Sequence, residues 1–188
     1  MAGHGREARH PDRSGCRAAG CAAAGGAVAL KKPDELDPQR LIRHRAMDLL
    51  ARREHSAHEL QAKLVEKFPE HAPLVEPVLA GLTRDNLQSD QRFAESYVCA
   101  LIHRGQGPYR IRQALQQRGV DTSLAEQTIA VCDEDWFELA VQVMHKKYGR
   151  QPCTSFAERA RRSRFLQYRG FSAEQIQACF TDNETDDG

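Results

Sequence analysis

The sequence repeats itself at an interval of 51 residues, and this repeat constrains the fold more than any other feature. Leu64, Leu115 and Leu166 are spaced by that interval. It also relates further sets of positions: Gly119 and Gly170, Val120 and Phe171, and Ala46, Tyr97 and Tyr148. The first repeat departs from the pattern, because Phe68-Pro69 stands where the others have glycine and an apolar residue. An interval near 50 residues is typical of helical units that stack on their neighbours.

Almost every segment between these positions reads as helix, because apolar residues recur three and four positions apart and no segment alternates as a strand does. The predicted helices span residues 38–53, 57–67, 73–86, 90–104, 108–118, 122–132, 134–148, 155–169 and 173–180. We therefore predict an all-α fold of three tandem three-helix units in an elongated array. The predicted parts are a disordered N-terminal extension (1–36), three units (37–88, 89–132 and 133–181) and an acidic disordered tail (182–188).

Residues that start and stop helices support this division. Asp37 precedes Pro38 at the first helix, and Pro73 and Pro108 suit first turns. Serine followed three positions later by Glu or Gln predicts capping boxes that begin at four residues: Ser56, Ser123, Ser155 and Ser172. Glycines that favour left-handed helix ends stand at four positions: Gly105, Gly119, Gly149 and Gly170.

Composition narrows the class of protein. The chain has 188 residues and a formal net charge of +1. No stretch approaches the roughly 18 apolar residues that a membrane span needs, so we expect no membrane contact and a cytoplasmic protein. The stretch Ala18–Leu30 follows four arginines, but Val28 and Leu30 are its only strong hydrophobes, which makes a poor signal peptide. A disordered N-terminal extension, or a start codon assigned too early, explains this stretch better.

Cysteines and histidines predict no metal or cofactor. The six cysteines form no C-x-x-C pair, and reduced thiols are the simple interpretation. Cys99, Cys132 and Cys179 fall in apolar helical patterns and are expected in the core. Cys16 and Cys21 could bind a metal only with other ligands. His55 and His58 lack a third ligand at zinc spacing, so we expect a surface pair.

Arginine is the unusual feature of the helical part. In "RIRQALQQRGV" (Arg110–Val120), Ile111 and Leu115 share one side of the helix, and the opposite side carries arginine and glutamine but no acid. Between Ala140 and Phe171 there are eight lysines and arginines against Glu158 alone. Such a face fits phosphates or an acidic protein, or it is a solvated surface that merely lacks acids.

Three nearby features have a structural interpretation beside a functional one. Arg118 and Arg169 lie in last helical turns, where the helix dipole favours a cation. "GQGPYR" (Gly105–Arg110) is either an anion site at a helix start or a bare turn. Trp136 is expected in the core, although Trp136-Phe137 could anchor a partner.

Four segments in order resemble the RecX family, bacterial regulators of the RecA recombinase. They are "AMDLLARREHSAHELQAKL" (Ala46–Leu64), "RFAESYV" (Arg92–Val98), "GPYRIRQALQQRGV" (Gly107–Val120) and "RFLQYRGFSAEQI" (Arg164–Ile176). The resemblance covers residues 40–181. It implies three tandem three-helix units in a curved, elongated molecule. Such a protein is expected to lie in the groove of the RecA–single-stranded DNA filament and to inhibit ATP hydrolysis, strand exchange and repressor co-cleavage.

The resemblance transfers no catalytic residue, and no nucleophile, metal or phosphate-loop motif appears in the sequence, so we expect a regulator and not an enzyme. The residues expected to face the filament or its DNA are Arg104, Tyr109, Arg110, Arg112, Arg118, Lys146, Lys147, Arg161, Arg162, Arg164 and Arg169. We expect a monomer whose contact with single-stranded DNA is weak or made through the filament. The alternative is a stand-alone nucleic-acid-binding helical protein.

Overall fold

The computed structural model describes residues 37–181, and within that range it contains nine α-helices, one short 3-10 helix and no strand. The elements are α1 (Pro38–Leu50), α2 (Ala57–Lys67), η2 (Pro69–His71), α3 (Ala72–Arg84), α4 (Asp90–His103), α5 (Pro108–Gln117), α6 (Thr122–Val131), α7 (Trp136–Tyr148), α8 (Phe156–Arg169) and α9 (Ala173–Thr181). Every predicted helix is present, with ends displaced by three residues at most. The predictions for residues 1–36 and 182–188 lie outside the described residues.

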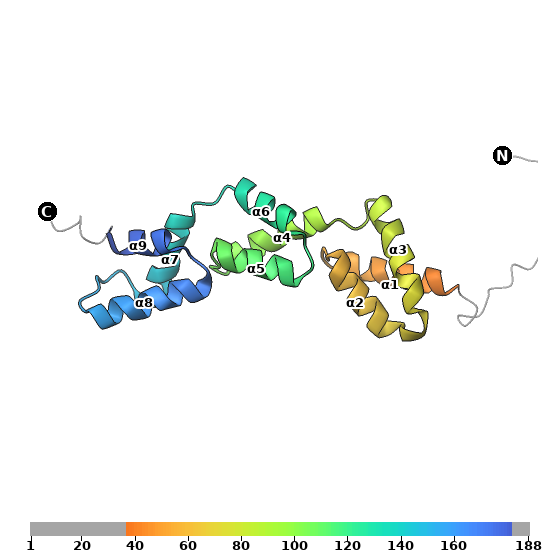
Figure 1. Cartoon of the computed structure of the whole chain (residues 1–188), viewed down its shortest axis with the longest axis horizontal. Coiled ribbons are helices and arrows are strands. Elements are labelled where there is room, and N and C mark those ends of the chain that lie inside the picture. The colour runs from red at the N-terminus through yellow and green to blue at the C-terminus, as the bar shows by residue number, and fades with distance from the viewer. Residues whose placement is uncertain (1–36, 182–188) are drawn as a thin grey trace, which may run out of the picture.

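The helices form three units in a row: α1 to α3, α4 to α6 and α7 to α9 (Figure 1). Each unit has its own cluster of buried apolar side chains. Leu64, Leu115 and Leu166 are each fully buried, one in each cluster, which confirms the sequence repeat. Trp136 is half-buried and packs against both the second and the third cluster, so it joins two units.

Helices α5 and α8 end in the same way. The backbone N–H of Gly119 donates to Gln116 and that of Val120 to Leu115, at 2.9 and 3.1 Å. The same pair of bonds follows α8, where Gly170 and Phe171 donate at 2.9 and 3.1 Å. Gly119 and Gly170 have φ of 75° and 90°, a conformation that glycine adopts without strain. After each of these turns, the next helix packs against the other two helices of the same unit.

The predicted capping boxes have different outcomes. Ser172 and Gln175 cap each other reciprocally, since each side chain accepts the other's backbone N–H. Ser56 and Ser155 cap their helices as N-cap residues. The box at Ser123 is wrong. The carboxylate of Asp121, two residues earlier, accepts from the N–H groups of residues 123 and 124, so Asp121 is the N-cap.

Two predictions about burial are wrong, and a third is confirmed in part. Cys99 was expected in the core but is exposed, whereas Cys179 is buried as predicted. Cys132 is half-buried and packs against the core of the second unit. His55 was expected on the surface but is 2% exposed, because it lies under the contact between the first two units. Each helix in residues 37–181 is too short or too polar to cross a membrane.

Candidate functional site

The contact between the first and second units, here the first junction, places the end of α5 against the start of α2. The hydroxyl of Ser56 donates to the carbonyl of Arg118 at 2.7 Å. The guanidinium of Arg118 donates to the carboxylate of Glu59 and lies 4.9 Å above the ring centre of Tyr97. The charge of Arg118 is therefore neutralised inside the protein.

The carboxylate of Glu59 is only 11% exposed and holds the first junction together. Besides Arg118, it contacts a guanidinium nitrogen of Arg53 at 3.1 Å and Nδ1 of His55 at 2.9 Å. Burial, followed by the positive charges of Arg53, Lys63 and Arg118, lowers the pKa of His55 to about 4. At neutral pH the ring is uncharged, and its Nδ1–H donates to Glu59.

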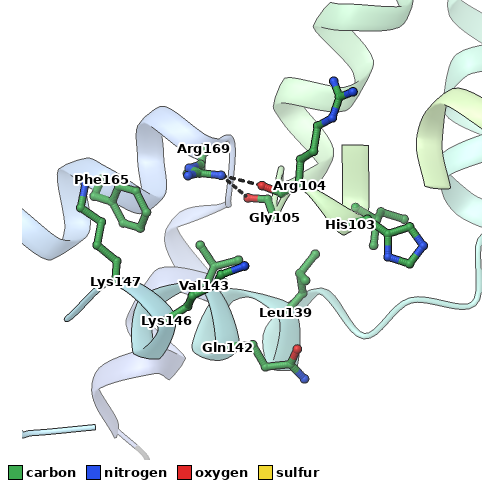
Figure 2. Close-up of a pocket in the computed structure, with 11 residues that line it drawn as sticks. His103, Arg104, Gly105, Leu139, Gln142, Val143, Lys146, Lys147, Phe165 and Arg169 are labelled. Carbon is green, nitrogen blue, oxygen red and sulfur yellow. Dashed lines mark hydrogen bonds between the residues drawn. The ribbon is translucent and has the colours of Figure 1, made fainter. Parts of the chain in front are cut away.

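The second junction places the end of α8 against the start of α5. The backbone N–H of Gly107 donates to the carbonyl of Arg169 at 2.8 Å, and that of Tyr109 donates to Gly170 at 3.1 Å. Arg169 donates to the carbonyls of Arg104 at 2.6 Å and Gly105 at 3.5 Å (Figure 2). A Cβ at Gly107 would lie 2.5 Å from the carbonyl oxygen of Gly170.

Of the two interpretations of "GQGPYR", an anion site or a bare turn, these contacts favour the turn. The N–H groups of Gly107 and Tyr109 already donate to carbonyls of the third unit. Gly107 is a glycine because the neighbouring backbone leaves no room for a side chain. The segment is a docking turn between units.

Arg162 was expected to face outward, and the structure contradicts this. Its side chain is 3% exposed and donates to Glu158 at 2.5 Å and to the carbonyl of Gln151 at 2.9 Å. It also lies 5.3 Å above the ring centre of Tyr148. The hydrogen bond from Arg162 lowers the pKa of Glu158. Arg162 therefore holds the segment before α8 in place and contributes nothing to the surface.

Four of the expected residues line a hollow of about 270 Å³ between α4, α7 and α8, although the side chain of Arg104 points away from the others (Figure 2). They are Arg104, Lys146, Lys147 and Arg169. Apolar side chains, among them Leu139, Val143 and Phe165, also line it, and the ammonium of Lys147 lies 4.3 Å from the ring centre of Phe165. No carboxylate lines this hollow. Within residues 37–181, the exposed side chains of Arg104 and Lys146 form no hydrogen bond or ion pair.

Three more expected residues line a second hollow of about 450 Å³, which we name the α5–α8 hollow. It is lined by Tyr109, Arg110, Arg112, Gln113, Gln116, Gln167, Tyr168 and Gly170. The guanidinium of Arg110 lies 5.5 Å from the ring centre of Tyr168, and that of Arg112 lies 5.7 Å from the ring centre of Tyr109. Arg161 and Arg164 are exposed on α8 and line neither hollow.

Two features of the α5–α8 hollow differ from expectation. Glu126 of α6 lies 3.6 Å from Arg112, so the outer face of α5 does have an acidic neighbour. Tyr168, which is 74% exposed, was not among the expected residues. Its position two residues after the buried Leu166 turns it about 200° away from the core, and this signal could have identified it.

In the part of the chain that the structure describes, no three His, Cys, Asp or Glu side chains gather in a way that could hold a metal ion. The two hollows are surfaces of cations, aromatic rings and amides. Side chains of these kinds are suited to contacts with anionic or aromatic groups.

The chain matches three domain models of one family: the first, second and third three-helix domains of RecX, over residues 43–72, 89–129 and 133–180. It is 40% identical over 159 residues to the regulatory protein RecX of Serratia proteamaculans, covering 73% of this chain and 95% of that protein. This chain belongs to the RecX family. A second RecX, from Pseudomonas syringae pv. tomato, is 38% identical over 82% of this chain and 99% of its own length.

Solved structures of RecX proteins have the same fold. The crystal structure of RecX from Lactobacillus salivarius aligns with a TM-score of 0.65 over 78% of this chain and 96% of that chain, at 22% sequence identity. A second RecX crystal structure aligns with a TM-score of 0.64 at 26% identity, over 74% of this chain and 70% of that one. Members of the RecX family are regulatory proteins and not enzymes, so the two hollows are to be explained as binding surfaces.

Proposed function

We propose that this chain is a cytoplasmic, monomeric negative regulator of the RecA recombinase. It binds in the groove of the RecA–single-stranded DNA filament and inhibits ATP hydrolysis, strand exchange and co-protease activity. Membership of the RecX family supports regulation as the role. The exposed cations on the second and third units support the choice of an acidic or phosphate-bearing partner.

One observation carries the proposal. Arg104, Lys146 and Arg164 are exposed and form no side-chain hydrogen bond or ion pair among the described residues, whereas Arg118 and Arg162 are engaged internally. Cations that stabilise nothing inside the protein are available to an outside anion. Arg104 directly follows α4, and Lys146 and Arg164 lie on α7 and α8, so a partner would contact two adjacent units at once.

The elongated shape suits a groove. Three units in a row present a long surface, and a filament groove offers an equally extended one (Figure 1). A protein held by two units would link neighbouring subunits of the filament and resist the rearrangements that accompany ATP turnover. Inhibition then needs no catalytic residue.

The test is an ATPase titration of RecA on single-stranded DNA. The wild type should suppress turnover at or below a one-to-one ratio with RecA. The double variant Arg104→Ala/Lys146→Ala should need about thirtyfold more protein, since two lost contacts at about 1 kcal/mol each sum to about 2 kcal/mol. The matched control is Arg40→Ala/Arg52→Ala, which removes two exposed cations from the first unit. Unchanged turnover at saturating wild-type protein would overturn the proposal.

Stand-alone nucleic-acid binding is the second candidate, and the α5–α8 hollow favours it. A passive competitor for DNA would inhibit only when it covers the DNA, and added free DNA would relieve it. A filament regulator should keep inhibiting when free DNA is added.

A further inference from the structure

We infer that the α5–α8 hollow is a stacking site for unpaired nucleobases, in which Tyr109 and Tyr168 are the platforms. The inference rests on the proposed function in one respect only, namely that single-stranded DNA is within reach of the bound protein. It assigns the contact with DNA bases to the α5–α8 hollow. The hollow around Lys146 and Phe165 is not part of this inference.

Exposure of the two rings is the first argument. The side chains of Tyr109 and Tyr168 are 57% and 74% exposed, so neither contributes much to a core. In each case a guanidinium lies over the ring, 5.7 Å from Tyr109 and 5.5 Å from Tyr168. A ring has two faces, and the exposed fraction shows that much of each ring remains open to solvent. An arginine on one face leaves the other free for a flat partner.

The chemistry of the lining is the second argument. Aromatic rings that stack on bases, with arginines nearby for the backbone, are the combination that binds single strands. Arg110 forms no ion pair, and Arg112 reaches Glu126 only at 3.6 Å, which is too long for a hydrogen bond. The amides of Gln113 and Gln167 can both donate to and accept from base edges. The lining itself holds no carboxylate, and the neighbouring Glu126 lies beside the positive charge of Arg112.

The second junction fixes the distance between the two platforms. Tyr109 begins α5 and Tyr168 ends α8, and the hydrogen bonds from Gly107 to Arg169 and from Tyr109 to Gly170 tie these helix ends together. Two rings on separate units are thereby held as one surface. Bases within a duplex have both faces covered by their neighbours, so this surface selects a single strand.

The experiment compares two fluorescent oligonucleotides of equal length, oligo-dT and an abasic strand, in anisotropy titrations at low ionic strength. The wild type should bind oligo-dT more tightly than the abasic strand. Tyr109→Leu/Tyr168→Leu should lower the affinity for oligo-dT about tenfold or more, since each stacked base is worth roughly 1–3 kcal/mol, and should leave the affinity for the abasic strand unchanged. Tyr109→Phe/Tyr168→Phe keeps the rings and should bind like the wild type.

Two controls separate stacking from folding and from charge. Phe156→Leu removes another aromatic ring, 88% exposed, and should leave both affinities unchanged. The leucine variants should keep the wild-type dependence of log affinity on log salt, whereas Arg110→Ala should reduce its slope by roughly 0.7. Thermal melting of each variant checks that it is folded.

The results that would overturn this inference differ from those that would overturn the proposed function. Equal binding of the two strands by the wild type, including no binding of either, would overturn the stacking site. So would leucine variants that lose filament affinity but keep oligo-dT affinity, because the rings would then contact protein. If the wild type leaves RecA turnover unchanged but binds oligo-dT through the tyrosines, the proposed function fails and the stacking site stands.

Discussion

The first and second junctions use equivalent positions of the repeat but are held by different forces. In both, the end of one unit's middle helix meets the start of the preceding unit's middle helix (Figure 1). The carbonyl of Arg118 accepts from the hydroxyl of Ser56, and 51 residues later the carbonyl of Arg169 accepts from the N–H of Gly107. The positions in contact are repeated, but the donors differ: a side-chain hydroxyl at the first junction and backbone N–H groups at the second.

One exchange of charge accounts for the difference. The position of Glu59 in the first junction is that of Arg110 in the second, 51 residues on. Arg118 therefore pairs with a carboxylate, whereas Arg169 would face another arginine. Arg169 instead donates to the carbonyls of Arg104 and Gly105, and Arg110 lies over Tyr168. Ionic contacts hold the first junction together, whereas Arg110 at the second junction remains exposed at the surface.

The largest expected effect tests whether the units themselves are equivalent, so that differences can be assigned to the junctions. Leu115 and Leu166 are both fully buried and support the helices that end at the two junctions. Leu115→Ala and Leu166→Ala should each lower the free energy of unfolding by about 2–5 kcal/mol, through lost burial and a cavity. Urea unfolding measures this. A cost below about 1 kcal/mol at either site would show that its unit is loosely packed.

The next effect is a pH dependence confined to the first junction. Because the pKa of His55 is lowered to about 4 from 6.5, the unfolded chain takes up its proton first as the pH falls. The folded state should therefore lose stability as the pH falls from about 6.5 to about 4, by up to about 3 kcal/mol. His55→Gln, which copies Gln106 at the equivalent position of the second junction, should remove that part of the dependence. If the free energies of unfolding of the wild type and the variant change equally with pH over this range, the assignment to His55 is wrong.

A smaller difference separates the two arginines. Arg118→Ala leaves Glu59, which is only 11% exposed, without one of its partners and should cost about 1–3 kcal/mol. Arg169→Ala removes bonds to two backbone carbonyls near the surface and should cost about 0.5–1.5 kcal/mol. The comparison is made by urea unfolding at one pH near neutrality. Equal costs would mean that the ionic contacts add nothing to the first junction.

The sequence correctly predicted the features that depend on residues close to one another in the sequence. The helix ends at Gly119 and Gly170 and the three buried leucines follow from local patterns, and the structure confirms them. Contacts between units could not be predicted in the same way. Arg118 meets Glu59 across 59 residues, and nothing near either residue indicates the pairing.

The same reason explains the errors in the candidate site. Arg112 has Glu126 beside it because α6 packs against α5. The strongly basic sequence around Arg162 predicts an outward-facing side chain. In the structure, the segment before α8 covers it, and Arg162 donates to the carbonyl of Gln151. His55 lies in the connection between α1 and α2, and its burial beside Arg118 of the next unit cannot be seen in the neighbouring sequence. Ser123 was misread for a local reason, because two candidate caps compete and Asp121 is the one that accepts the free N–H groups.

The smallest expected effect comes from a substitution that makes the second junction resemble the first. Arg110→Glu places a carboxylate where the repeat has Glu59, next to the helix end that carries Arg169, because residue 110 lies against Gly170. An ion pair at this partly exposed site should stabilise the protein by about 0.2–1 kcal/mol, and Arg110→Gln is the control that removes the charge without adding a new one. A double-mutant cycle with Arg169→Ala in urea unfolding isolates the pairwise energy. Affinity for oligo-dT should fall in the same variant, because a carboxylate would then face the phosphates. A coupling energy near zero would mean that the two junctions differ in geometry as well as in charge.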